Sequence, residues 1–469
     1  MTRILIIGGG PAGYEAALVA AQLGAAVTLV EREAPGGACV LYDCVPSKTF
    51  IATSGLMETL RESSTLGVRG GEPDDVIVDA PAVHGRVRHL AEAQSADIRA
   101  RLEREGVEVV TGTAHLLTAR GAGRKHVAEI GDPSGPSARA VEADTVLIAT
   151  GATPRVIPGA EPDGDRILTW RQVYDLPRLP EHLVVIGSGV TGAEFASAYL
   201  EMGVEVTLVS SRDRVLPGED SDAAELLESV FAKRGMRILS RSRAAAVRRT
   251  AGGVVVELTD GRTVGGSHAL MTVGSVPNVG DLGLADVGVE CDERGFVAVD
   301  RVSRTSVAGM YAAGDCTGLM MLASVAAMQG RIAVWHALGE AVSPLQLKTV
   351  SANVFTHPEL ATVGIQQQAV DRGDIAARTV MLPLATNARA KMQDVTEGFI
   401  KLFCRPATGV VIGGVVVAPA ASELILPITI AVQNRLSAAQ LANTFSVYPS
   451  MSGSITEAAR QLMEHDDLD

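Results

Sequence analysis

The sequence predicts an α/β protein made of two strand–helix–strand domains and a C-terminal α+β domain. Two observations lead to this. A short apolar strand, a glycine-rich turn, a helix and a second strand follow one another at the start of the chain, and the same order recurs after residue 180. From about Lys348 the pattern changes to short apolar strands (354–355, 399–404 and 410–417) and helices (422–433 and 454–464), which indicates a separate α+β domain.

Length and composition agree with this organisation. A chain of 469 residues is long enough for about three domains. The net charge of −13 argues against nucleic acid or an anionic membrane as the main partner, and 3% aromatic residues leave few platforms for stacking bases. The five cysteines do not have the spacing of a secreted disulfide scaffold, so we expect a reducing compartment and a cytoplasmic protein.

No membrane segment is expected. The N-terminus enters an apolar strand directly, without the basic region, long apolar core and cleavage site of a signal peptide. Residues 410–432 are apolar over a length that could span a bilayer, but Pro419, Glu423 and Pro427 interrupt them. A strand, a turn and a buried helix fit this stretch better than a membrane span.

The first glycine-rich turn has the spacing of a dinucleotide-binding fingerprint. Gly8, Gly10 and Gly13 follow the strand that begins at Arg3 and open a helical pattern. In this context the glycines allow the backbone to approach a pyrophosphate, which faces the helix N-terminus. Glu31 ends the second strand, about 20 residues on, where a carboxylate would hold ribose hydroxyls. The turn therefore predicts a dinucleotide site.

The second turn repeats this pattern after a proline-rich boundary at residues 177–180. Gly187, Gly189 and Gly192 lie between a strand at 183–186 and a helix that runs to Gly203, and a further strand covers 205–209. A second complete unit implies a second dinucleotide site. We expect its sheet to continue through residues 254–258 and to end near Gly274.

Other segments are expected to complete the domains. Residues 82–105 have the pattern of a solvated helix, 108–114 and 144–148 of strands, and 121–139 of a polar hairpin tip. The strand at 144–148 is followed by Thr150-Gly151. Residues 311–313 form another apolar strand that leads to Gly314 and Asp315; this acid suits either a helix cap or sugar binding.

Cys39 and Cys44 are the candidate redox residues. They stand one helical turn and a fraction apart, so both sulfurs can lie on one helix face. If Cys44 lies near a helix N-terminus with Lys48 close by, the local positive potential favours its thiolate. The alternative is a pair of buried, unreactive thiols, because free cysteine is among the most buried residue types.

Together these motifs closely resemble the flavoprotein (pyridine nucleotide) disulfide reductases, the family of dihydrolipoamide dehydrogenase and glutathione reductase. The resemblance covers essentially the whole chain. It rests on the segments 8–13, 39–48, 150–151, 187–194, 314–315 and 354–359, which occur in the family's order. It implies two Rossmann-like domains of the three-layer ββα type for FAD and NAD(P), a C-terminal dimerisation domain and a homodimer. The implied division is 1–155 and 276–345 for FAD, 156–275 for NAD(P)H and 346–469 for the interface.

The resemblance also implies the roles of single residues. Glu31 would bind the adenosine ribose of FAD and Asp315 its ribityl chain, while Lys48 would pair with Glu194 beside the flavin. Cys44 would stack on the flavin and form a charge-transfer complex as a thiolate, and Cys39 would attack an external disulfide. The residues expected to bind FAD are Gly8, Gly10, Pro11, Ala12, Gly13, Glu31, Arg32, Gly37, Ala38, Cys39, Cys44, Lys48, Ala114, Thr150, Gly151, Gly314, Asp315, Met321, Leu322 and Ala323.

The nicotinamide nucleotide would bind at the second turn. The residues expected there are Gly187, Gly189, Val190, Gly192, Glu194, Ser210, Arg212 and Gly274. Val190 stands where some relatives place an aromatic gate, so we expect an open pocket. NAD-specific members carry an acid where this chain has Ser210, and Arg212 offers a cation to a 2′-phosphate, although it also suits a solvated loop. We expect NADPH to be accepted, alongside NADH.

One departure from the family decides the expected reaction. The family's C-terminal motif His-Pro-Thr-x-Ser-Glu supplies a histidine base and its glutamate partner to the active site of the other subunit. This chain has Tyr448 and Gly453 at those two positions. Tyrosine, with an ordinary pKa of about 10, is a poor proton acceptor at neutral pH. Glu457 and His465 follow in the sequence, but their spacing places neither over Cys39.

The expected function is therefore hydride transfer from NAD(P)H to FAD and onward to a quinone, with disulfide reduction weak or absent. This is an NAD(P)H:quinone reductase on a disulfide-reductase frame. The first alternative is a dihydrolipoamide dehydrogenase-like or other thiol–disulfide reductase that uses Cys39 and Cys44 with another base. A pyridine-nucleotide transhydrogenase and a non-enzymatic redox sensor are further alternatives.

Overall fold

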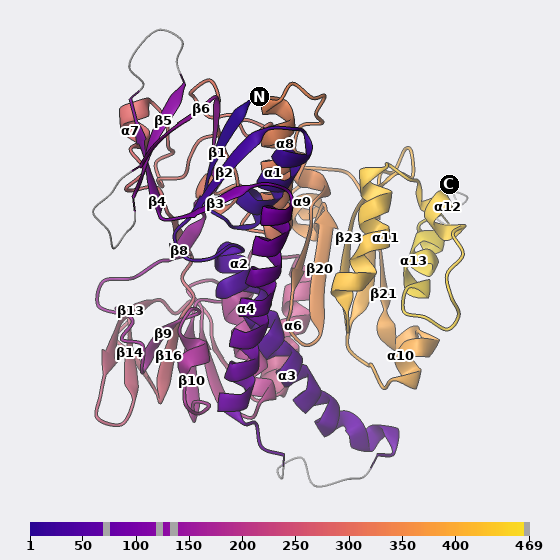
Figure 1. Ribbon diagram of the computed structural model, residues 1–469. Helices are drawn as coiled ribbons and strands as arrows, with labels where there is room; N and C mark the ends of the chain where they lie inside the picture. Colours follow the sequence, from indigo (N-terminus) through magenta and orange to yellow (C-terminus); the bar gives the residue numbers. More distant parts are fainter. Residues whose placement is uncertain (69–75, 119–124, 132–138, 464–469) are drawn as a thin grey trace. The chain divides into compact units, whose positions relative to one another are not determined.

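A computed structural model of the chain describes residues 1–68, 76–118, 125–131 and 139–463 (Figure 1). The described chain forms two compact units. Unit 1 contains Met1–Thr49, His84–Arg155 and Gly274–Gln346, and unit 2 contains Phe50–Val83, Val156–Val273 and Leu347–Asp469.

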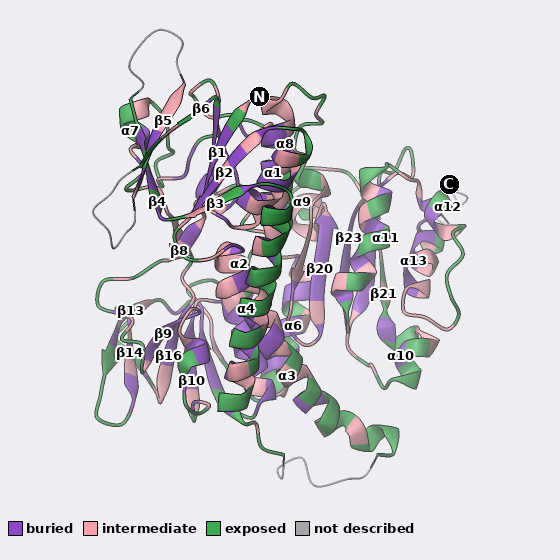
Figure 2. Cartoon of the chain, in the orientation of Figure 1, coloured by how far each residue is buried: buried purple, intermediate pink, exposed green. Residues whose placement is uncertain are grey.

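Unit 1 is built on a parallel five-stranded sheet with the order β18-β7-β1-β2-β3. The strands are β1 (Arg3–Ile7), β2 (Ala26–Glu31), β3 (Glu108–Thr111), β7 (Thr145–Ile148) and β18 (Met310–Ala312). Helices α1 (Pro11–Gln22) and α8 (Ala323–Ala337) pack on it, and α4 (Ala80–Arg104) is largely exposed, as its charged pattern predicts (Figure 2).

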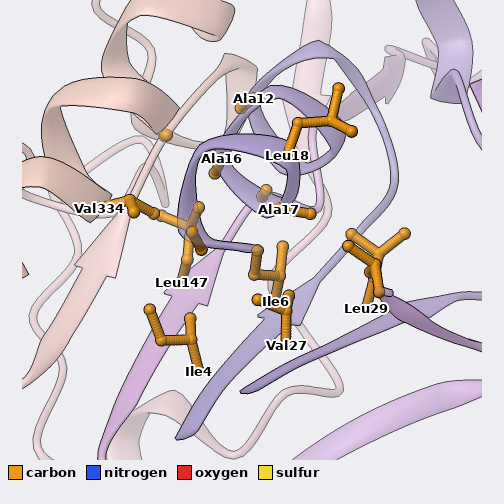
Figure 3. Close-up of a cluster of buried hydrophobic side chains, with 14 of the residues drawn as sticks. Ile4, Ile6, Ala12, Ala16, Ala17, Leu18, Val27, Leu29, Leu147 and Val334 are labelled. Atoms are coloured by element: carbon orange, nitrogen blue, oxygen red, sulfur yellow. The ribbon is translucent and has the colours of Figure 1, made fainter. Parts of the chain in front are cut away.

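Small residues bring α1 close to this sheet. Figure 3 shows Ala16, Ala17 and Leu18 of α1 near Ile6 and Leu29 of the sheet, and all five side chains are buried. Alanine at the contact lets the helix backbone lie close to the strands, which holds the N-terminus of α1 at the carboxyl end of β1.

Two smaller sheets complete unit 1. An antiparallel sheet contains β4 (Thr113–Leu117), β5 (His126–Gly131) and β6 (Arg139–Ala143), and a second pairs β8 (Ala152–Pro154) with β17 (Ser275–Pro277); α7 (Leu284–Val287) is a short helix. The hairpin tip expected at 121–139 is therefore wrong where β5 lies, and its residues 121–124 and 132–138 fall outside the described residues. The single strand expected at 108–114 is divided at Gly112, whose φ of 154° suits glycine.

Unit 2 contains a second parallel sheet, with the order β12-β11-β10-β16-β9. The strands are β9 (Ile167–Thr169), β10 (His182–Ile186), β11 (Glu205–Val209), β12 (Arg237–Leu239) and β16 (His268–Met271), with helices α5 (Val190–Glu201) and α6 (Ser221–Lys233). The expectation that residues 254–258 continue this sheet is wrong. They form β14 (Val254–Leu258) of a separate antiparallel sheet with β13 (Ala244–Arg249) and β15 (Thr263–Gly266).

The C-terminal part of unit 2 is an antiparallel sheet with the order β19-β20-β23-β22-β21, as expected for an α+β domain. Its strands are β19 (Ser351–Val354), β20 (Glu359–Gly364), β21 (Arg378–Pro383), β22 (Phe399–Cys404) and β23 (Val411–Ala418). Its helices are α9 (Gln367–Asp371), α10 (Ala388–Met392), α11 (Ala421–Gln433), α12 (Ala438–Ala442) and α13 (Gly453–Met463).

Residues 410–432 form a strand and a helix, β23 and α11, as their prolines predict. Strand β23 is almost entirely buried, whereas α11 exposes Leu426 and Ile430 (Figure 2). In the described part of the chain, no helix combines the length and the apolar character that a bilayer crossing requires.

A buried ion-pair network fixes α6 to the C-terminal sheet within unit 2. The Lys401 ammonium, on β22, lies 2.6 Å from an Asp222 oxygen and 3.2 Å from an Asp220 oxygen. Lys401 and Asp220 are almost inaccessible, with 1% and 0% of their side chains exposed. Asp220 caps α6 and also accepts a hydrogen bond from the backbone N–H of Gln367 (2.8 Å). Removing one member would leave the other buried without its partner.

We expect Lys401→Ala to lower the free energy of unfolding by about 3–5 kcal/mol, because it leaves Asp220 as a buried, uncompensated charge. Lys233→Ala is the matched control, since Lys233 pairs with Glu397 on the surface and should cost less than about 1 kcal/mol. Calorimetric unfolding of both variants measures the difference. Equal losses of stability would contradict a structural role for the network.

Candidate active site

The first glycine-rich turn is shaped by backbone contacts that exclude any side chain. Gly8 has a φ of 105°, and a Cβ there would lie 2.3 Å from the Ala149 carbonyl oxygen. A Cβ on Gly13 would lie 1.9 Å from the Gly8 carbonyl oxygen. Gly10 caps α1 without a side chain, so the first-turn amides suit a phosphate. The turn thus has the shape that the sequence predicts.

Beside this turn lies a cavity of about 570 Å³. Five residues expected to bind FAD line it together: Gly8, Glu31, Arg32, Ala114 and Thr150. The Glu31 carboxylate accepts hydrogen bonds from the backbone N–H groups of Gly9 (2.6 Å) and Glu33 (2.9 Å), which fixes it at the carboxyl end of β2. A cavity with a fixed carboxylate and exposed turn amides suits the adenosine and pyrophosphate of FAD.

Sequence reasoning missed one wall of this cavity. Residues 277–282 contribute it, and Asn278 donates to the Thr150 carbonyl oxygen (3.0 Å). On the same wall the His115 Nδ1 lies 2.8 Å from the Asp281 carbonyl oxygen. No motif marks this segment, because it reaches the site through the short pairing of β8 with β17.

The dithiol segment packs directly on the glycine-rich turn. Gly36 donates a hydrogen bond to the Gly9 carbonyl oxygen (2.8 Å). Gly37 has a φ of 58°, and a Cβ there would lie 2.7 Å from the Gly10 Cα. These two contacts hold α2 (Gly37–Leu41), which carries Cys39, next to the expected pyrophosphate site.

The two cysteines lie on two helices rather than on one, which corrects the expectation from their spacing. Helix α2 ends at Leu41, with Tyr42 as its C-cap, and α3 (Cys44–Glu62) begins at Cys44. The chain turns between them, yet the two thiols are hydrogen-bonded to each other. Lys48 follows in the first turns of α3.

The two thiols influence each other's pKa. The hydrogen bond from Cys44 lowers the pKa of Cys39, against the opposing effects of burial and of Asp43 and Asp315, and Lys48 lowers it further. The same hydrogen bond, with burial, raises the pKa of Cys44. The thiolate that the family resemblance implies at Cys44, stacked on the flavin, stays a prediction.

Asp315 is the other titratable group of this region. Burial, and then the Asp43 carboxylate, raises its pKa to about 6. The preceding Gly314 N–H donates to the buried Gln329 side chain (2.9 Å), a contact that the sequence did not indicate. Met321, Leu322 and Ala323 lie at the start of α8, and the Met321 side chain is 44% exposed.

The second glycine-rich turn repeats the geometry of the first. Gly187 has a φ of 112°, and a Cβ there would lie 2.3 Å from the Thr272 carbonyl oxygen. A Cβ on Gly192 would lie 1.9 Å from the Gly187 oxygen, and Gly189 caps α5. Val190 is 41% exposed at the start of that helix, so no aromatic side chain covers this turn at position 190.

Ser210 is a buried support rather than an exposed ligand. Its hydroxyl lies 2.7 Å from the Ser188 hydroxyl and accepts a hydrogen bond from the Arg212 N–H (3.1 Å). Arg212 itself is exposed, and its carbonyl oxygen accepts a hydrogen bond from the Arg241 N–H (2.8 Å). Gly274 has a φ of 90° and belongs to unit 1. In the described part of the chain, no carboxylate lies within ion-pair distance of Arg212, and Ser210 fixes its backbone.

Within unit 2, α5 is held by the segment after β19. The Glu194 carboxylate is buried and accepts a hydrogen bond from the Phe355 N–H (2.9 Å). The Ser197 hydroxyl accepts one from the His357 N–H (3.2 Å), and Arg234 donates to the His357 carbonyl oxygen (2.9 Å). This segment served as a family motif in the sequence, and its role here is to fix Glu194 through backbone amides.

Tyr448, Gly453 and Glu457 all lie among the described C-terminal residues. Tyr448 is 85% exposed, and Gly453 begins α13. Hydrogen bonds from Arg460 and Gln461 lower the pKa of Glu457 to about 2, so its carboxylate is a weak proton acceptor. His465 lies outside the described residues.

Comparison with known proteins agrees with this geometry. Residues 2–330 match the family model of the pyridine nucleotide-disulphide oxidoreductases, and residues 350–459 match the model of that family's dimerisation domain. The chain belongs to the pyridine nucleotide-disulphide oxidoreductase family. The predicted family and fold class are confirmed, and the family implies FAD and a nicotinamide nucleotide as cofactors.

Named relatives lie in two groups within this family. An "NAD(P)H dehydrogenase (quinone)" of Mycobacterium tuberculosis is 60% identical over 472 residues, which covers 100% of this chain and 95% of that protein. A "dihydrolipoyl dehydrogenase" of Chlorobaculum tepidum is 35% identical over 460 residues, which covers 97% and 96%. The crystal structure of LpdA from M. tuberculosis superposes with a TM-score of 0.94 at 59% identity, covering 99% of this chain and 100% of that one.

We expect Gly37→Ala to reduce FAD loading sharply, because its Cβ would collide with the Gly10 backbone and displace both the dithiol helix and the pyrophosphate turn. Gly24→Ala is the control: Gly24 also has a positive φ, of 80°, but nothing lies within 4 Å of its Cβ position. The ratio of flavin to protein absorbance after purification measures loading. Equal flavin content in both variants would show that the contact does not shape the site.

Proposed function

We propose that this protein is a flavoenzyme that oxidises NAD(P)H and reduces quinones. When bound, FAD would take hydride from NAD(P)H and pass electrons to the acceptor. The observation that carries the proposal is the occupation of the family's histidine and glutamate positions by Tyr448 and Gly453. The name of the M. tuberculosis relative at 60% identity supports the quinone as acceptor.

Separate groups of residues in the chain would bind FAD and NADPH and orient them. The amides after Gly10 and the Glu31 carboxylate would hold the pyrophosphate and ribose of FAD, and Asp315 its ribityl chain. Lys48 and Glu194 are proposed to act as a pair at the reactive end of the flavin. The exposed Arg212 would meet the 2′-phosphate of NADPH, while no carboxylate at position 210 would repel it.

Disulfide reduction would be slow because the last proton transfer has no base. Transfer of a proton by a positioned side chain typically contributes on the order of 10²–10⁴-fold to a rate. A tyrosine hydroxyl is ordinarily a poor proton acceptor at neutral pH, and hydrogen bonds from Arg460 and Gln461 lower the pKa of Glu457 to about 2. A quinone requires no thiol exchange and so avoids this step.

Thiol–disulfide reduction is the second candidate function. The intact Cys39–Cys44 pair and the lowered pKa of Cys39 favour it, because a thiolate is the attacking species in disulfide exchange. This function requires Cys39 and Cys44 to be oxidised and reduced in each catalytic cycle. Direct electron transfer from the flavin to a quinone does not require the thiols.

We also propose that the protein is a homodimer. In each chain, residues 1–155 and 276–345 would form the FAD domain, 156–275 the NAD(P)H domain and 346–469 the dimer interface. The match of 350–459 to a dimerisation domain supports this. Large apolar side chains are exposed there, among them Leu426, Ile430, Phe445 and Val447. Exposed apolar side chains that lie together are typical of a protein interface.

Steady-state oxidation of NADPH and NADH tests the function. We expect Cys44→Ser to lose the charge-transfer band and to keep most of the benzoquinone turnover, because the acceptor does not use the thiols. Cys291→Ser, at an exposed cysteine outside the site, is the matched control. Lipoamide, glutathione disulfide and benzoquinone serve as acceptors. Fast turnover with a disulfide, or loss of quinone turnover in Cys39→Ser and Cys44→Ser, would favour the thiol–disulfide reductase instead.

A further inference from the structure

A second large cavity lies in unit 2, at one end of the C-terminal sheet. Its volume is about 1040 Å³, enough for a ligand the size of a mononucleotide. It is lined by the end of β20, the start of β23, helix α9 and the segment that follows α11, which Figure 1 shows around the sheet. None of the residues expected to bind FAD or NAD(P)H lines it.

The lining of this cavity is strongly basic. It contains Lys348, Arg372, Arg405 and Arg435 against one carboxylate, Asp374, which leaves an excess of three positive charges in a chain whose net charge is −13. The Asp374 carboxylate already forms an ion pair with Arg372, with 2.8 Å between the carboxylate oxygen and the guanidinium nitrogen. Among the described residues, no carboxylate lies within ion-pair distance of the other three. Like charges gathered at one hollow repel one another, and an anion bound there would relieve the repulsion.

The local backbone brings two of these arginines to the same cavity. Arg405 begins the turn between β22 and β23, and Arg435 follows α11. The Val411 N–H donates to the Leu436 carbonyl oxygen (2.9 Å), and the Ala438 N–H donates to Gly409 (2.8 Å), so the two turns are joined. Arg435 has a φ of 55°, a conformation that favours glycine. The arginine is thus placed against the preference of its backbone.

The wall also has polar residues, Thr349, Gln366 and Gln368, and a half-exposed apolar part. Ile365, Ile375, Val410, Ile412 and Val432 line the cavity, and each is only partly covered by the protein. A bare inorganic anion would leave these side chains in water. A ligand with an apolar body would cover them while its charged group meets the arginines.

We propose that this cavity binds a phosphorylated organic anion with a flat apolar body, separately from the two dinucleotide sites. The phosphate would accept hydrogen bonds from Arg405 and Arg435, with Lys348 as a further cation. The isoleucine and valine side chains would contact the apolar body.

Isothermal titration of the FAD-loaded enzyme with 2-naphthyl phosphate tests this site, with saturating NADP⁺ present to occupy the nicotinamide nucleotide site. We expect one ligand per chain, tighter binding than for inorganic phosphate, and an affinity that falls as salt is raised. The variant Arg405→Gln/Arg435→Gly removes both guanidinium groups, and glycine suits the backbone at 435. It should weaken binding about tenfold or more for each arginine removed.

Arg248→Ala/Arg294→Ala is the matched control. It removes the same charge from two exposed arginines that pair with Glu257 and Asp292 elsewhere on the surface. We expect unchanged affinity in this variant. Absence of binding to the wild-type enzyme, or equal affinities in the wild type and both variants, would overturn the proposal. Circular dichroism and turnover of NADPH with benzoquinone confirm that each variant is folded.

Discussion

The site depends on close contact between glycine backbones at the carboxyl end of β1. The Gly8 N–H donates to the Val30 carbonyl oxygen (2.8 Å), and its Cα lies against the Ala149 carbonyl group, so one residue joins three strands of the sheet. Gly37 then lies against Gly10 from the dithiol segment. Any side chain at these points would separate the turn, the sheet and α2, because backbone atoms in the way cannot move aside as a flexible side chain can.

This packing also affects the pKa values of the two thiols. Partial burial at the turn raises the cost of charge on both sulfurs, and the hydrogen bond between them lowers the pKa of Cys39 and raises that of Cys44. We propose that disulfide exchange has no base at its last proton transfer, because Tyr448 stands at the family's histidine position and Glu457 forms an ion pair with Arg460.

Features set by short stretches of sequence were predictable. Both glycine-rich turns, the strands beside them and the position of Glu31 follow from local spacing, because the backbone contacts of a strand–turn–helix unit are made within some 20 residues. The prolines at 419 and 427 likewise identified β23 and α11 correctly. The family motifs supplied the residues of the first cavity that local spacing alone leaves undetermined, such as Ala114.

Features that depend on distant pairing were not predictable from local spacing. Asn278 reaches the first cavity because β17 pairs with β8, more than a hundred residues earlier. Residues 254–258 have an ordinary strand pattern, which does not reveal that they pair with β13 and β15 instead of the parallel sheet. The spacing of Cys39 and Cys44 suits one helix, but the chain leaves α2 at Tyr42 and begins α3 two residues later.

We propose that the residues at positions 448 and 453, and not the thiol pair, limit disulfide reduction. Restoring the family's residues in Tyr448→His/Gly453→Glu, with Tyr448→Phe as control, tests this directly by steady-state oxidation of NADH with lipoamide. We expect the rate of NADH oxidation with lipoamide to rise by up to roughly 10²–10⁴-fold in the double variant, and the rate with benzoquinone to stay unchanged. Lipoamide turnover in the wild type that already equals quinone turnover, or no gain in a folded, FAD-loaded double variant, would contradict this proposal.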